Sequence, residues 1–176
     1  MMDDSNAAGR GHSEPVAFGR RLAGSEAFKA MFREGMGLVE ETASYLDREG
    51  RKESKRLSRA GSLSYAAESM RLTTRLMQLA SWLLLQRAVN EGDISADQAG
   101  RERAKVKLGG VSSSTEGAGW DDLPERLREL IDRSLRLQGR VMRLDAALRQ
   151  QPDAPAGDNP IARDLGRIAE AFAGRK

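Results

Sequence analysis

The sequence predicts an all-α protein, an antiparallel three-helix bundle with long helices and flexible N- and C-terminal tails. Leu, Ala, Arg and Glu, which favour helices, are plentiful among its 176 residues, whereas aromatic residues make up only 5%. Three segments, 25–47, 57–90 and 123–150, carry apolar residues three and four positions apart, which is the spacing of one helical face. Helices joined by short connections fold back on one another, so these three should form a bundle.

The first helix is predicted over residues 25–47, and Ser25 is a suitable N-cap residue. Its apolar stripe comprises Phe28, Phe32, Val39, Ala43 and Leu46, widened by Met31, Leu38 and Tyr45. Gly35 and Gly37 weaken the helix but allow a neighbouring helix to approach closely. A short turn over residues 48–54 should then reverse the chain.

The second helix, over residues 57–90, contains no proline, is about 50 Å long and carries two apolar rows. The first row is Ala60, Leu63, Ala67, Met70, Thr74, Met77, Ser81, Leu84 and Ala88, and the second is Tyr65, Leu72, Leu76, Leu79 and Leu83. A surface helix needs only one apolar stripe, so the other row should be covered by a partner. We expect the first row to pack in the bundle, and we predict a homodimer interface at Leu72, Leu76, Leu79 and Leu83.

The connection to the third helix is predicted to contain a possible short helix, 96–108, and a loop, 109–119. Ser95 and Gln98 match a capping box at the start of the short helix. The third helix, 123–150, has a second capping-box pattern at Asp122 and Glu125. Its seam is a sustained three-four repeat: Leu127, Leu130, Ser134, Leu137, Val141, Leu144 and Leu148.

Both ends of the chain lack the pattern of a packed core. Residues 1–24 are polar and rich in glycine, and we expect them to be disordered. Residues 151–176 begin with a Pro-rich linker, QPDAPAGDNP, and end in a short amphipathic segment with one apolar row: Ile161, Leu165, Ile168 and Phe172. This row either packs back on the bundle or binds a partner, and the linker favours partner binding because it gives the segment reach.

The sequence offers little equipment for chemistry. It has no cysteine, and its single histidine, His12, has no nearby residues at metal-ligand spacing. We therefore expect no catalytic residue, no metal and no cofactor, and a protein that is not an enzyme. The N-terminus lacks the apolar stretch of a secretory signal, and the longest uncharged apolar run, 76–86, is too short to span a membrane. A cytoplasmic protein is predicted.

The strongest charged feature is a basic run that comprises Arg51, Lys52, Lys55, Arg56 and Arg59. Three interpretations stay open: a solvated turn, a docking site for an acidic partner, or a contact with a nucleic-acid backbone. Nucleic acid is the weaker choice, because no aromatic residues interleave the run and the net charge is only +3.

The stretch YAAESMRLTTRLMQLASWLLLQRAVNEGDIS resembles the RcdA family of alphaproteobacteria, the regulators of CtrA degradation. SEAFKAMFREGMGLVEETASYLD and LPERLRELIDRSLRLQGRVMRLD extend the resemblance over most of residues 25–150. It implies a non-enzymatic adaptor of the ClpXP protease in cell-cycle proteolysis, with substrate or other adaptor proteins as partners, an important C-terminal tail, and a location at a cell pole. The residues by themselves indicate a helical protein-interaction module. The alternatives are a nucleic-acid-associated regulator and a structural dimer scaffold.

Overall fold

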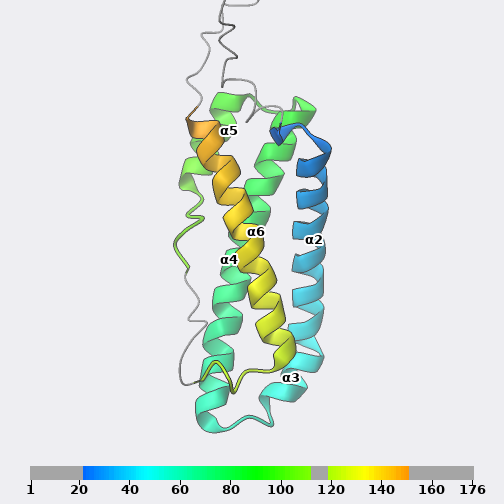
Figure 1. Ribbon diagram of the computed structural model, residues 1–176, viewed down its shortest axis with the longest axis vertical. Helices are drawn as coiled ribbons and strands as arrows, with labels where there is room; N and C mark the ends of the chain where they lie inside the picture. The colour runs from blue at the N-terminus through cyan, green and yellow to red at the C-terminus, as the bar shows by residue number, and fades with distance from the viewer. Residues whose placement is uncertain (1–21, 112–118, 151–176) are drawn as a thin grey trace, which may run out of the picture.

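The computed structural model describes residues 22–111 and 119–150 and shows an all-α fold. In order, its helices are α2 (Glu26–Asp47), α3 (Glu49–Ser54), α4 (Arg59–Glu91), α5 (Ala96–Lys105) and α6 (Glu125–Arg149), and the described ranges hold no strand. The three long helices, α2, α4 and α6, pack side by side, with α3 at one end of the bundle and α5 at the other (Figure 1). The predicted three-helix bundle is confirmed.

The directions of the helices are less simple than an up-and-down bundle. The helix α2 runs antiparallel to the other two, but α4 and α6 are parallel (Figure 1). Arg75 and Trp82 of α4 contact Ser134 and Asp145 of α6, in the same order along both helices. The chain must therefore return along the bundle between α5 and α6. Extended chain covers about 3.3 Å per residue, so the connection 106–124 is long enough to span a helix of about 50 Å.

Two buried side chains hold this returning connection against the bundle. Arg75, which is fully buried, donates to the hydroxyl of Ser134 at 3.0 Å and to the carbonyl of Val111 at 3.3 Å. The amide of Gln138 donates to the carbonyl of Leu108. Buried polar groups cost free energy unless they are hydrogen-bonded, so these contacts fix where the connection crosses α4 and α6.

Most helix ends lie where the local sequence predicts them. The Ser25 hydroxyl accepts a hydrogen bond from the Phe28 backbone N–H at 3.4 Å, and Ser95 accepts from Gln98 at 3.1 Å. At the end of α4, Gly92 adopts a left-handed conformation with φ of 82°, which glycine tolerates without steric cost.

Two local predictions are wrong. The helix α6 begins at Glu125 with Pro124 in the N-cap position and with no side-chain cap, so Asp122 does not form the expected capping box. The segment predicted as a turn, 48–54, instead contains α3. Gly50 is buried there, and a Cβ at this position would lie 2.3 Å from the Tyr65 hydroxyl, so only glycine lets α3 pack this closely.

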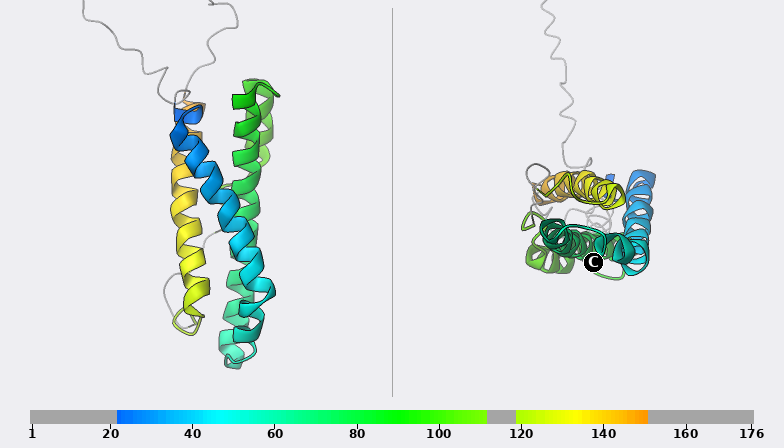
Figure 2. Two further views of the ribbon diagram at one scale, coloured as in Figure 1. Left: turned by 90° about the vertical axis from the view of Figure 1, so that its right-hand side faces the viewer. Right: turned by 90° about the horizontal axis from the view of Figure 1, so that it is seen from below.

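The hydrophobic core lies between the three long helices, and α2 crosses α4 and α6 obliquely (Figure 2). The predicted seam of α6 is confirmed: all of its members are buried except Leu148, which is partly buried. In α2 the residues expected only to widen the stripe, Met31, Leu38 and Tyr45, are buried together with Phe28. The other large members of the predicted stripe, Phe32, Val39 and Leu46, are only partly buried. The predicted tails 1–24 and 151–176 lie outside the described residues, apart from residues 22–24.

Candidate protein-interaction surfaces

The basic run lies at the end of the bundle that α3 forms, and all five of its side chains are exposed. The hydroxyl of Tyr45 in α2 donates to the Glu53 carboxylate at 2.6 Å and so ties α3 to the bundle. Burial, together with this contact to Glu53, raises the pKa of Tyr45 above its ordinary value. The structure thus gathers the basic residues on one exposed end, as a docking surface requires.

The four leucines predicted for the dimer interface are part of the core instead. Leu72, Leu76, Leu79 and Leu83 are at most 3% exposed within a single chain. They face α2 and α6, so they are already covered when the chain folds. The assignment of these residues to a contact between two chains is therefore wrong.

The opposite face of α4 is the one left uncovered. Leu63, Met70, Met77 and Leu84 are 75%, 72%, 67% and 50% exposed. They are seven residues apart, so they share one helical face, and they extend over about 32 Å. These four residues, here called the outer row, belong to the set expected in the core. Soluble monomers rarely expose apolar patches larger than a few hundred Å², so the outer row is a candidate contact surface.

The outer row is continuous with an apolar groove between α2 and α4. The groove has a volume of about 150 Å³ and is lined by Val39, Ala43, Leu46, Thr73, Met77 and Ala80, among others. The row of α4 that runs from Leu63 to Ala88 holds only apolar or small uncharged side chains. The two exposed arginines of this stretch are already paired, Arg71 with Glu68 and Arg87 with Glu91. A second apolar helix can approach such a face without burying an unpaired charge.

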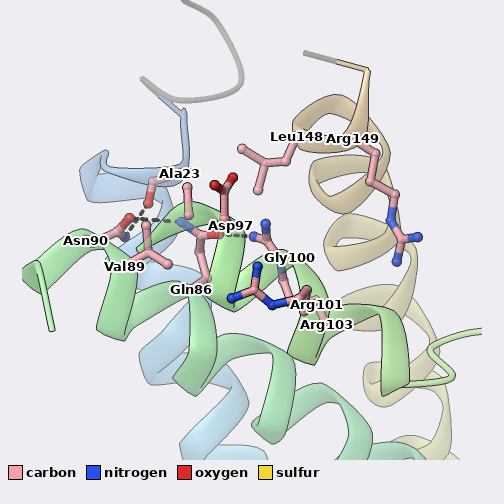
Figure 3. A pocket seen from close by; sticks show the side chains of 11 residues that line it. Ala23, Gln86, Val89, Asn90, Asp97, Gly100, Arg101, Arg103, Leu148 and Arg149 are labelled. Carbon is pink, nitrogen blue, oxygen red and sulfur yellow. Dashed lines mark hydrogen bonds between the residues drawn. The ribbon is translucent and has the colours of Figure 1, made fainter. Parts of the chain in front are cut away.

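A larger pocket, of about 710 Å³, lies at the end of the bundle that holds α5 (Figure 3). It is lined by Ala23 near the start of the described chain, by one face of α5, and by the ends of α4 and α6. Three arginines line it, Arg101, Arg103 and Arg149, together with one acidic residue, Asp97. The sequence pattern does not predict this pocket, because the α5 segment has the pattern of a charged helix with little apolar face.

A network of hydrogen bonds holds the upper wall of the pocket. The amide of Asn90 donates to the carbonyl of Ala23 at 2.6 Å, and the amide of Gln86 donates to the Asn90 side chain at 3.0 Å. Arg103 in turn donates to the Gln86 carbonyl and lies over the Trp82 ring, 5.8 Å from its centroid. The wall is thus fixed by side chains of α4 and α5 and by the backbone carbonyl of Ala23 (Figure 3).

Trp82 does not line the pocket itself but lies against Arg103, which does. The Trp82 indole N–H donates to the Asp145 carboxylate at 2.8 Å, and Arg149 donates to the same carboxylate at 2.7 Å. Burial lowers the pKa of Arg103, while the Coulomb attraction of Asp145 acts in the opposite direction. Arginine nevertheless keeps its charge in proteins, so Arg103 presents a cation beside the aromatic ring.

Three further expectations concern the C-terminal row, metal binding and membrane spans. The predicted partner-binding row, Ile161 to Phe172, lies outside the described residues. Within residues 22–111 and 119–150, no cluster of acidic or histidine side chains could hold a metal ion. None of the helices in these ranges is long and apolar enough to cross a membrane.

The comparisons with known proteins agree on one family. Residues 19–172 match the family described as "Protein of unknown function (DUF1465)". Among solved structures, the chain is similar to the crystal structure of RcdA from Caulobacter crescentus CB15, with 51% sequence identity and a TM-score of 0.59. The similarity covers 70% of this chain and 92% of RcdA. This chain belongs to the RcdA family.

The match to the RcdA family reaches beyond the three-helix bundle. The matched range ends at residue 172, so it includes the whole apolar row from Ile161 to Phe172. Together with the similarity to the RcdA crystal structure, this match confirms the family resemblance that the α4 sequence indicates. None of the curated proteins matches the chain.

Proposed function

We propose that the chain is a non-enzymatic adaptor that helps deliver cell-cycle regulatory substrates to the ClpXP protease. The observation that carries this proposal is the 51% identity to RcdA over 92% of the RcdA chain, since the family takes its name from the regulation of CtrA degradation. The fold supports it, because the described residues offer exposed apolar and basic surfaces on a rigid bundle. Such surfaces suit binding to other proteins.

The mechanism follows from effective concentration. An adaptor that binds a substrate and the protease together turns the second contact into an intramolecular one, so a weak contact becomes sufficient. We propose that the C-terminal row Ile161, Leu165, Ile168 and Phe172 makes one of these contacts. The basic run 51–59 is the proposed docking site for an acidic partner, and its exposure at one end of the bundle supports that role.

We further propose that the chain works as a homodimer and that the outer row of α4 forms the interface. This proposal keeps the predicted dimer but moves its contact to the other side of the helix. Four large apolar side chains in one uncharged row, extended by the groove toward α2, give a second copy an apolar surface to cover. A cytoplasmic location, concentrated at a cell pole, is also part of the proposal, and a fluorescent fusion observed in alphaproteobacterial cells would test it.

The test is a reconstituted degradation assay with purified ClpXP, CtrA as substrate and the full chain. We expect the chain to accelerate loss of the substrate. Replacing Leu165 and Phe172 by Ser should abolish the acceleration, while the matched change of Ala162 and Ala169 to Ser should not. No acceleration by the wild-type chain, with CtrA or with other candidate cell-cycle substrates, would refute the proposed function. An unchanged rate with the Leu165 and Phe172 variant would move substrate contact from the tail to the bundle.

A second candidate function is a nucleic-acid-associated regulator. The observation that favours it is the exposure of all five cations of the basic run at one end of the bundle. Retention on DNA that weakens steeply with salt would support it. A structural dimer scaffold is the third candidate, and removal of residues 151–176 would then leave its partners and their activity unchanged.

A further inference from the structure

The pocket at the α5 end combines positive charge with an apolar wall. Arg101 and Arg103 come from α5 and Arg149 from α6, while Val89 and Leu148 line the same cavity (Figure 3). Its volume of about 710 Å³ is within the range of sites that hold ligands or short peptide segments. This pocket lies at the end of the bundle opposite the basic run, so it is a separate surface (Figure 1).

The three arginines of the pocket differ in what they already bind. Arg103 is committed to Gln86, and Arg149 is committed to Asp145. Arg101 is exposed and takes part in no ion pair among the described residues. Arg101 thus keeps its donors available, while the other two lie in fixed positions and add to the positive potential at the cavity.

The charge balance of the pocket favours a carboxylate over a more highly charged anion. Asp97 lines the cavity, and Asp145 is paired with Arg149, which also lines it. These two carboxylates offset much of the positive charge, which makes the site less suited to a doubly charged phosphate. Among the described residues, none that lines the cavity has an aromatic ring to stack on a nucleic-acid base, whereas its apolar residues can hold an aliphatic side chain.

We propose that this pocket binds a short acidic peptide segment of a partner protein. A glutamate or aspartate carboxylate would pair with Arg101 beside Arg103, and a neighbouring apolar side chain would pack against Leu148 and Val89. Guanidinium groups bind carboxylates through charge-assisted, often bidentate hydrogen bonds, so charge complementarity supplies the recognition. The inference deepens the proposed function, on which it rests, by assigning a second docking site and the chemistry of its ligand.

The position of Trp82 supplies a direct readout. Arg103 lies over its ring, so a peptide that engages the arginines should change the emission of Trp82. The chain has two tryptophans, and the change Trp120→Phe leaves Trp82 as the only one. The probe is a blocked hexapeptide of alternating leucine and glutamate, titrated into the full chain that carries this change. Calorimetry on the unchanged wild-type chain provides a measurement that does not depend on the substitution.

We expect saturable binding of the glutamate peptide by both methods and much weaker binding of the same peptide with glutamine in place of glutamate. The change Arg101→Gln should weaken binding about tenfold, as expected for the loss of one hydrogen bond to a charged group. The matched change Arg136→Gln, at an exposed arginine of α6 that does not line the pocket, should leave binding unchanged. Circular dichroism of each variant checks that it is folded.

The proposal would be overturned by the absence of saturable binding, by equal binding of the glutamine peptide, or by unchanged binding after Arg101→Gln. Inorganic phosphate that shifts Trp82 emission as strongly as the peptide would identify a general anion site, which also contradicts the proposal. The last probe is a leucine peptide whose sole carboxylate is its C-terminus. If it binds more tightly than the leucine–glutamate hexapeptide, the choice of a side-chain carboxylate as the ligand is overturned. No protease is present, so failure here is separate from failure of the degradation assay.

Discussion

Two glycines of α2 give a direct test of how closely the helices pack. Gly35 is buried, and a Cβ there would lie 2.6 Å from the Cδ1 atom of Leu83 and 3.5 Å from the Cδ2 atom of Leu137. A Cβ at Gly37 would meet no atom within 4 Å. The changes Gly35→Ala and Gly37→Ala are therefore chemically identical, two residues apart in one helix, and differ only in what the new methyl group meets.

The free energy of unfolding should increase in Gly37→Ala but should not increase in Gly35→Ala. Alanine is about 1 kcal/mol better than glycine in a helix interior, so Gly37→Ala should stabilise the protein by about that amount. Gly35→Ala gains the same helix propensity, but its new methyl group would overlap Leu83, which is fully buried and cannot move toward solvent. Overpacking costs about 1–3 kcal/mol, so Gly35→Ala should range from neutral to about 2 kcal/mol destabilised.

The measurement is urea denaturation, followed by far-UV circular dichroism at one protein concentration for the wild type and both variants. The gain in helix propensity is common to both variants, so it cancels in the difference between their free energies of unfolding. This difference should equal the overpacking cost, about 1–3 kcal/mol, and the slope of the unfolding free energy against urea concentration should be unchanged. A Gly35→Ala variant as stable as Gly37→Ala would refute the reasoning, because it would mean that α4 does not approach α2 at Gly35.

Three further outcomes follow from buried or capping groups. Asp145→Ala leaves the buried Trp82 indole N–H without its partner and should cost about 1–3 kcal/mol in urea denaturation. Ser25→Ala removes the N-cap of α2 and should cost about 1 kcal/mol in the same assay. The pKa of Tyr45 is raised in the folded state, so the fold favours the neutral phenol, and this stability is lost as the pH rises past about 10. Tyr45→Phe removes that loss, so melting temperatures between neutral and alkaline pH should fall less in the variant than in the wild type.

The α6 seam could be predicted from sequence because α6 has one clear apolar row. The helix α4 has two apolar rows with the same helical spacing, so the spacing alone does not show which row faces the core. The sequence favours the row from Ala60 to Ala88 as the core face, yet the inward face of α4 contains the buried Glu68, Arg75 and Gln86. Arg75 is accommodated there because Ser134, 59 residues away, accepts its hydrogen bond. Such distant partners are set by the fold and leave no local pattern.

The same limit applies to the glycines and to the α5 pocket. Gly35 and Gly37 looked equivalent, but only Gly35 faces a neighbouring helix. The pocket joins Ala23, Asn90, Arg103 and Arg149, which are brought together because α4 and α6 run parallel and so end at the same end of the bundle. A long connection is compatible with either helix direction, so the sequence did not determine this arrangement.

The outer row of α4 is central to the account, because it holds four of the five large apolar side chains that are exposed among the described residues. Light scattering of the full chain at micromolar concentration tests it most directly, in parallel with Met77→Glu and Leu76→Glu. We predict a dimer for the wild type and a folded monomer for Met77→Glu, since Met77 is 67% exposed in the single chain. Leu76→Glu places a charge in the core and should unfold the protein. A monomeric wild type, or a Met77→Glu variant that remains dimeric, would contradict the account.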